Sequence, residues 1–190
     1  MQHKPIYALC DYQTLEKFGI SLPQFLEKIS SYDVVYIQYR DKLNSIEIQK
    51  QNILYLKQHT NIPIIINDHF ELLEFCDGLH LGQEDIEKVY PKNKTLALNI
   101  IQKKYPNKII GLSTHNELEI LEANSLALDY IGLGAYRSTS TKDVTNILGD
   151  KLQYLAKIST HPVGAIGGVQ ITDDIPYVSY NVIGSGLLKD

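Results

Sequence analysis

Charged side chains next to apolar runs are the residues of this sequence best suited to chemistry. The segment Gln38-Tyr39-Arg40-Asp41-Lys42 follows one such run and places two cations two positions apart. Side chains two positions apart in an extended chain project from the same side, so Arg40 and Lys42 can face one ligand. The pattern predicts an anion site, because guanidinium and ammonium groups form strong hydrogen bonds with phosphate.

A second segment, Ser138-Thr139-Ser140-Thr141-Lys142, combines hydroxyl groups with one ammonium group. Donors of both kinds in one polar loop suit an anion such as phosphate. A solvated surface loop has the same composition. Both interpretations of this segment stay open at this point.

Glycines follow the last two apolar runs, in Gly167-Gly168 and in Gly184-Ser185-Gly186. They let backbone N–H groups approach phosphate oxygens, and a helix that starts nearby adds its dipole. Tight turns alone would explain either pair. Two pairs at the last two strand ends favour a phosphate site, because barrels commonly bind phosphate there.

Two aspartates, Asp68 and Asp85, each lie just past an apolar run. Carboxylates that face a pyrophosphate could hold Mg²⁺, which prefers one or two carboxylates together with phosphate oxygens and water. The alternative is that each aspartate caps the helix that follows it. Spacing alone leaves both interpretations open.

The histidines and cysteines indicate no nucleophilic catalysis. No Ser–His–Asp or Cys–His spacing stands out, and His80 lies inside an apolar run, as a hydrogen-bonded core residue would. Cys10 and Cys76 have neither metal-like nor redox-like spacing, so we expect both to be small core residues.

Eight apolar runs recur at fairly even spacing and predict the strands. They are rich in Ile and Val and show no helical period, which is typical of parallel strands buried on both faces. They comprise residues 6–10, 34–37, 62–66, 78–81, 109–112, 130–133, 163–166 and 181–183.

Helical periodicity between these runs predicts helices over residues 21–31, 45–59, 116–126 and 145–159. In the third helix we expect Leu118, Leu121 and Leu126 on the inner face. Strand and helix alternating eight times predict a closed (β/α)₈ TIM barrel, with a doubly wound open sheet as the alternative. In a barrel the polar strand ends meet on one face, so residues far apart in sequence become neighbours.

Composition sets the remaining limits. The 190 residues suit a single domain over 1–190, and 44% hydrophobic with 21% charged residues is typical of a globular protein. A net charge of −4 does not suggest a nucleic-acid partner. No apolar run approaches the roughly 18 residues of a membrane span, and no signal-peptide core is seen, so a cytoplasmic location is expected.

Six segments resemble, in order, the successive motifs of the thiamine phosphate synthase family. The resemblance covers about residues 6 to 187. The segments are Gln38 to Lys42, Ile66 to Asp68, His80 to Asp85, Gly111 to His115, Thr139 to Lys142, and Ile166 to Gly168.

The resemblance implies a transferase that condenses hydroxymethylpyrimidine pyrophosphate with thiazole phosphate, or its carboxylated form, by Mg²⁺-assisted dissociative substitution. The products are thiamine phosphate and pyrophosphate. It implies Mg²⁺ ligands at Asp68 and Asp85, and catalytic roles for Arg40, Lys42, Ser113 and Lys142. The implied pyrimidine-pyrophosphate contacts are Gln38, Tyr39, Arg40, Asp41, Lys42, Asn67, Ser113 and Lys142. The implied thiazole-phosphate contacts are Thr139, Ser140, Thr141, Gly168, Gly184 and Ser185.

The chain also departs from the family pattern. It ends at Asp190, where the family continues into a last helix, so a trimmed barrel is expected. An open flank would leave apolar surface for a second subunit, which makes a homodimer a hypothesis. Light scattering that gave the mass of one chain would count against it.

Two other functions are compatible with this fold. A thiazole tautomerase-like isomerase would carry a catalytic histidine just after the glycine that closes strand six, where this chain has Ala135. A non-catalytic paralogue that binds phosphorylated ligands would keep the contacts without turnover. The retained cations and carboxylates favour the synthase over both.

Overall fold

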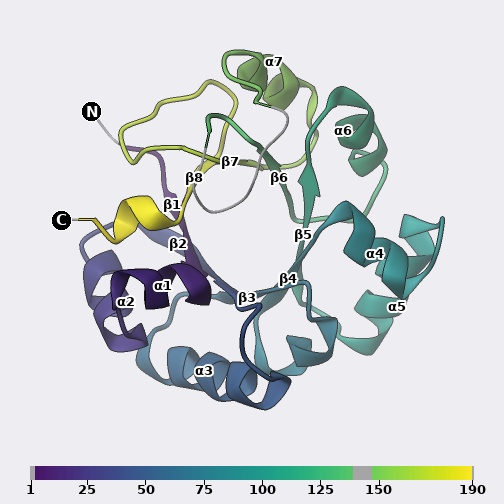
Figure 1. Ribbon diagram of the computed structural model, residues 1–190. Helices are drawn as coiled ribbons and strands as arrows, with labels where there is room; N and C mark the ends of the chain where they lie inside the picture. The colour runs from purple at the N-terminus through teal and green to yellow at the C-terminus, as the bar shows by residue number, and fades with distance from the viewer. Residues whose placement is uncertain (1–2, 139–146, 190) are drawn as a thin grey trace.

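Eight parallel strands close into a barrel in the computed structural model, which describes residues 3–138 and 147–189 (Figure 1). Each strand pairs with the next along the chain, and β8 pairs with β1 to close the ring. This closure confirms the barrel and excludes the doubly wound sheet. The strands are β1 (Ile6–Asp11), β2 (Val34–Arg40), β3 (Ile64–Asn67), β4 (Gly78–Leu81), β5 (Ile109–Thr114), β6 (Tyr130–Gly134), β7 (Val163–Ile166) and β8 (Tyr180–Ile183).

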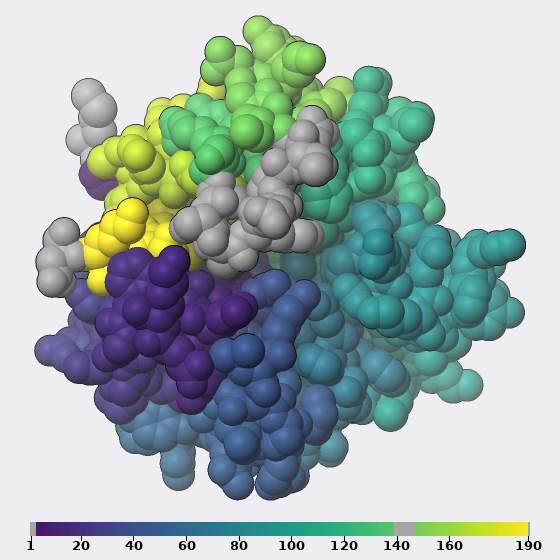
Figure 2. Space-filling view, in the orientation of Figure 1, coloured from purple at the N-terminus to yellow at the C-terminus, as the bar shows by residue number. Residues whose placement is uncertain are grey.

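Helices surround the ring of strands, and their apolar faces pack on it (Figure 1). The α-helices are α1 (Tyr12–Phe18), α2 (Leu22–Ile29), α3 (Ile46–His59), α4 (Gln83–Val89), α5 (Lys94–Lys104), α6 (Glu117–Ala123) and α7 (Lys151–Ile158). Two 3₁₀ helices, η1 (Phe70–Phe75) and η2 (Ser185–Leu187), follow β3 and β8. In the space-filling view the purple N-terminal and yellow C-terminal parts lie against each other, as the β1–β8 pairing requires (Figure 2).

The predicted alternation of strand and helix is not kept at every position. Only the 3₁₀ helix η1 joins β3 to β4, and residues 167–179, between β7 and β8, form no helix. Positive φ angles at Gly167 and Gly168 turn this second connection away from a helical path. Its buried side chains Val169, Ile175 and Val178 cover the barrel in place of a helix.

Local capping explains where several predicted helices begin. Ser21 and Gln24 form a capping box at α2, and Ser45 caps α3. The helix predicted over 145–159 starts later, because Gly149 has a φ of 50° and α7 begins at Lys151. The first two residues of that predicted range lie outside the described residues.

The face predicted for α6 is also wrong. Leu118 and Leu121 are 79% and 51% exposed, and Ile120 and Ala123 are the buried side chains instead. Leu126 is buried as predicted, but it lies past the end of the helix. The helix begins after its cap at Asn116, which turns the 120/123 face toward the barrel. The short element has too few residues for periodicity to fix its phase.

Aromatic side chains fill much of the barrel interior. Tyr7, Ile65, Tyr130 and Val182 form a buried cluster, against which Tyr36 and others pack. Barrel interiors are more often filled by Val, Ile and Leu.

Within the described ranges, no helix is both long and apolar enough to cross a lipid bilayer.

Candidate active site

Arg40 ends strand β2 and forms an ion pair with Asp11, which ends β1. The β1–β2 register places these two residues side by side. The other oxygen of Asp11 accepts hydrogen bonds from the backbone N–H and the hydroxyl of Thr14, and so caps α1. Asp11 therefore holds the guanidinium in place. Sequence reasoning did not assign Asp11 to the site, because only the strand register reveals the pair.

Amide groups link the ends of β2 and β3. The Gln38 Nε2 donates to Asn67 Oδ1 at 2.7 Å, and the Asn67 Nδ2 donates to Asp68 Oδ2 at 2.5 Å. Gln38 is buried, whereas Asn67 and Asp68 are partly exposed. The three predicted site residues thus form one hydrogen-bonded group next to Arg40.

Asp68 and Asp85 come together in the structure, close enough for each to affect the pKa of the other. Burial raises the pKa of Asp68, and the charge of Asp85 raises it further, while Lys42 and Arg40 partly offset this. Burial also acts to raise the pKa of Asp85, but hydrogen bonds from Lys88 and Asp68, together with the charges of Lys88 and Lys42, leave it lowered. Of these two neighbouring carboxyl groups, Asp68 is therefore the weaker acid.

The helix-capping alternative for these aspartates is wrong. Gly82 is the N-cap of α4 and His69 that of η1, and neither helix has a side-chain cap. Asp68 also has a φ of 66°, a left-handed conformation that is costly for a residue with a side chain and concentrates at functional sites. A Cβ at Gly82 would lie 2.8 Å from the Asp85 carboxylate, so this glycine leaves that group its space.

Two carboxylates in contact, with basic side chains nearby, are a donor set that fits a hard divalent cation such as Mg²⁺. In the described ranges no three His, Cys, Asp or Glu side chains cluster in a way that could hold a metal. A divalent cation held by Asp68 and Asp85 would therefore need its remaining ligands from substrate oxygens and water.

The structure gives Tyr39 and Asp41 a different role from the one expected. Tyr39 is fully buried, donates its hydroxyl to Asp41 at 2.7 Å and accepts from Asn52 of α3. Asp41 is also buried and accepts hydrogen bonds from the backbone N–H groups of Leu43 and Asn44. These side chains point toward α3 and shape the loop after β2, so we correct their predicted substrate contact to support of that loop.

Ser113 lies near the end of β5, next to His80 of β4. Its hydroxyl is 2.8 Å from the His80 Nε2, and its carbonyl accepts a hydrogen bond of 2.6 Å from the Gln83 side chain. His80 is buried, as expected from its place in an apolar run, and burial lowers its pKa to about 4. The imidazole is therefore neutral at pH 7, and a role as a cationic anion ligand is excluded.

Gly167 and Gly168 allow the loops after β6 and β7 to approach closely. They have φ angles of 87° and 63°, and Cβ atoms there would lie 2.5 Å from Ala135 and 2.7 Å from Arg137. Arg137 also forms a two-pronged ion pair with Asp173 at 2.6 and 2.9 Å. Its charge is thus engaged within the loops.

The buried side chain of Asn181 in β8 binds the β7–β8 connection that covers it. Its Nδ2 donates to the carbonyls of Gln170 and Asp173 at 3.2 and 2.8 Å. Within the described part of the chain, no hydrogen bond uses the N–H groups of Gly168 or Ser185. Gly168 follows β7, and Ser185 follows Gly184 past the end of β8. Thr139, Ser140, Thr141 and Lys142 lie outside the described residues.

The closed barrel, with paired carboxylates beside basic side chains at its mouth, defines a (β/α)₈-barrel enzyme. A sequence profile described as "Thiamine monophosphate synthase" matches residues 6–179. Thiamine-phosphate synthase of Persephonella marina is 34% identical over 97% of this chain and 88% of its own. The chain belongs to the thiamine monophosphate synthase family.

Further relatives agree with this assignment. Thiamine-phosphate synthase of Staphylococcus epidermidis is 31% identical over 97% of this chain and 87% of its own. A solved structure, thiamine phosphate pyrophosphorylase from Pyrococcus furiosus, superimposes with a TM-score of 0.73 over 97% of this chain and 87% of its own. At 21% identity, that structure supports the fold alone.

Proposed function

We propose that this chain is a thiamine-phosphate synthase, a transferase that joins hydroxymethylpyrimidine pyrophosphate to thiazole phosphate and releases pyrophosphate. The observation that carries the proposal is the convergence of Arg40, Asp68 and Asp85 at one mouth of a family member's barrel. We also propose a cytoplasmic location, as expected from the sequence.

The pyrimidine substrate would occupy the side of the mouth formed by β2 to β5. Gln38, Asn67 and Ser113 offer amide and hydroxyl groups to the pyrimidine ring. Arg40 and Lys42, together with Lys142, would hold the pyrophosphate. Arg40 is already fixed by Asp11, and a preorganised donor stabilises charge without a reorganisation cost.

Asp68 and Asp85 would hold Mg²⁺ in this proposal. When bound, the ion would supply positive charge to the pyrophosphate oxygens. The charge of Lys42 already acts on both carboxyl groups, which supports its placement beside the same leaving group.

The thiazole phosphate would bind at the ends of β7 and β8. The backbone N–H groups of Gly168 and Ser185 would donate to its oxygens, and barrels commonly bind phosphate at this place. Thr139, Ser140 and Thr141 complete the proposed contacts. Holding the second substrate by its phosphate keeps its ring nitrogen close to the reacting carbon.

The chemistry explains why the described part of the site contains cations and no catalytic triad. The amino group of the pyrimidine can donate electrons toward the exocyclic CH₂, so the C–O bond breaks to give a stabilised cation and free pyrophosphate. The thiazole nitrogen then captures that cation. The protein's main task is to stabilise the departing negative charge, which Arg40 and Lys42 perform electrostatically.

The tautomerase alternative is not supported by the site. The position after the glycine that closes β6 is Ala135, which is buried and packs against Gly167. A histidine there would need space that the close approach of the two loops does not leave. We therefore retain the synthase as the proposed function.

A direct assay tests this proposal. Purified protein mixed with both phosphorylated precursors and Mg²⁺ is expected to form thiamine phosphate and pyrophosphate in equal amounts, measured by chromatography and a pyrophosphate assay. Binding of both precursors without product would point to the non-catalytic paralogue. Such a result with the wild-type chain would refute the proposal.

Replacing Asp85 with alanine is expected to raise the Mg²⁺ concentration for half-maximal activity by at least about tenfold, because one of two carboxylate ligands is lost. Glu84→Ala is the matched control, since it removes the same charge from the same helical turn at an exposed position. Circular dichroism would verify that both variants fold. An unchanged Mg²⁺ dependence in Asp85→Ala would remove this residue from the metal site.

A further inference from the structure

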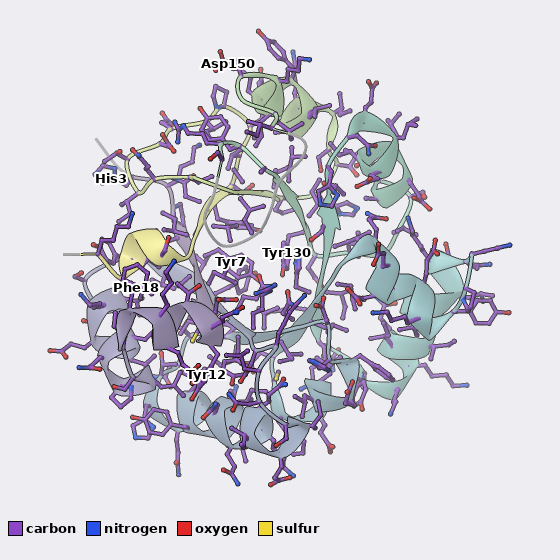
Figure 3. The ribbon with its side chains drawn as sticks, viewed as in Figure 1. His3, Tyr7, Tyr12, Phe18, Tyr130 and Asp150 are labelled. Carbon is purple, nitrogen blue, oxygen red and sulfur yellow. The ribbon has the colours of Figure 1, made fainter. Side chains whose placement is uncertain are left out.

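A line of hydrogen bonds runs through the barrel interior to the mouth. The hydroxyls of Tyr7 and Tyr130 are 2.7 Å apart, and the Tyr130 hydroxyl is 3.0 Å from the His80 Nδ1. The His80 Nε2 is in turn 2.8 Å from the hydroxyl of Ser113. Tyr7 and Tyr130 lie inside the ring of strands (Figure 3). Four strands, β1, β6, β4 and β5, each contribute one member to this line.

The buried end of the line fixes its direction. Tyr7 is 1% exposed, and in the described part of the chain Tyr130 is its one hydrogen-bond partner. If Tyr7 donates to the Tyr130 oxygen, Tyr130 donates its own hydrogen to the His80 Nδ1. The hydrogen of the neutral imidazole is then on Nε2 and is donated to the Ser113 oxygen. Every buried donor in the line has an acceptor.

The opposite direction leaves a donor unsatisfied. If Nδ1 carried the hydrogen, it would donate to Tyr130, and Tyr130 would donate to Tyr7. The Tyr7 hydrogen would then have no acceptor among the described residues, which is unfavourable for a fully buried group. A doubly protonated ring would create the same problem and would also place a positive charge in an apolar interior.

The backbone around the line leaves space for its rings. A Cβ at Gly111 would lie 2.1 Å from the Tyr130 ring, and a Cβ at Gly132 would lie 3.1 Å from the His80 ring. Gly111 is the register partner of Tyr130, and Gly132 that of Ser113. Two strands therefore carry glycine where the aromatic side chains of the line need room.

We propose that Tyr7, Tyr130 and His80 are positioning residues that make the Ser113 hydroxyl a hydrogen-bond donor toward the mouth. The oxygen of Ser113 accepts from His80, so its own hydrogen is directed at the ligand. The ligand atom that receives this hydrogen must then be an acceptor. For the substrate of the proposed function, on which this last step rests, that atom is a pyrimidine ring nitrogen rather than the amino group.

Nuclear magnetic resonance on the full chain tests the direction of the line without substrate. Protein labelled with ¹⁵N-histidine is expected to show His80 neutral at pH 7 with its hydrogen on Nε2. The His80 signals are assigned in the wild-type chain by through-bond correlations from the His80 backbone. A hydrogen on Nδ1, or on both nitrogens, would overturn the proposal. This readout needs no turnover, so it stands even if the wild-type assay shows no product.

Two substitutions of His80 test the effect on Ser113. A glutamine amide reaches the place of Nε2 and can donate to Ser113, whereas an asparagine amide reaches the place of Nδ1 and cannot. We expect His80→Asn to lower kcat/KM for the pyrimidine substrate about tenfold or more, with KM for thiazole phosphate unchanged. His80→Gln is expected to restore most of this loss.

Tyr36→Phe is the control for the aromatic cluster, because the Tyr36 ring packs there while its hydroxyl lies outside the line. It is expected to leave kcat/KM unchanged. Equal losses for His80→Gln and His80→Asn would show that His80 acts only in packing and would sink the proposal. If neither variant folds, the nitrogen signals of the wild-type chain still decide the direction.

Discussion

Replacing Arg40 with glutamine is expected to lower kcat by about 10²–10³-fold, the usual effect of removing one preorganised donor for developing negative charge. Arg40 ends β2 and its guanidinium is fixed by the buried Asp11, so its charge is held at the mouth before substrate binds. Glutamine keeps a hydrogen-bond donor but no charge. Steady-state kinetics with both phosphorylated precursors would measure the loss.

A double variant that also changes Asp11 separates the effect of Arg40→Gln on folding from its effect on turnover. Arg40→Gln alone leaves Asp11 as a buried carboxylate without a cation, which destabilises the fold. Adding Asp11→Asn removes that charge and retains a good cap for α1. The double variant is expected to regain thermal stability but not activity. Recovery of full activity would show that Arg40 serves the fold and not the reaction.

Replacing Gly111 with alanine is expected to lower the free energy of unfolding by about 1–3 kcal/mol, the usual effect of overpacking a core. The added Cβ would lie 2.1 Å from the Tyr130 ring. That ring cannot move aside easily, because it packs against Tyr7, Tyr36 and Tyr180. Thermal unfolding would measure the change, at about 2–4 °C for each kcal/mol in a chain of this size.

Gly132→Ala provides a graded control for this prediction. Its Cβ would lie 3.1 Å from the His80 ring, a milder contact, so a smaller loss of stability is expected. Both variants remove one glycine from a barrel strand, and both change backbone entropy equally. An equal melting temperature for Gly111→Ala and the wild type would contradict the packing described for the barrel interior.

The barrel could be predicted from sequence because parallel strands buried on both faces appear as short, continuous apolar runs. Runs such as 62–66 and 109–112 are apolar on both faces, and the structure places β3 and β5 over most of these residues. Helices were harder to predict where they are short. Periodicity did not fix the inner face of α6, and it extended α7 across Gly149, whose positive φ ends any helical path.

The site could be predicted as a set of strand ends but not as a set of contacts. Arg40, Asp68 and Asp85 converge because every parallel strand ends at the same mouth. Which side chains point inward depends on register and on the loop that follows, so Asp41 was assigned to substrate although its carboxylate supports the loop. Asp11 was missed for the same reason, since its role appears only when β1 pairs with β2.

The β7–β8 connection shows how a barrel can manage without one of its outer helices. The side-chain amide of Asn181 joins this connection to strand β8 through hydrogen bonds. The buried side chains of Val169, Ile175 and Val178 cover the strands beneath it. This irregular segment therefore covers the outside of the strands and also fixes the loop at the mouth after β7. Because the β7–β8 side of the mouth is held by contacts separate from those that hold Arg40, either side could be redesigned for a new ligand while the other keeps its shape.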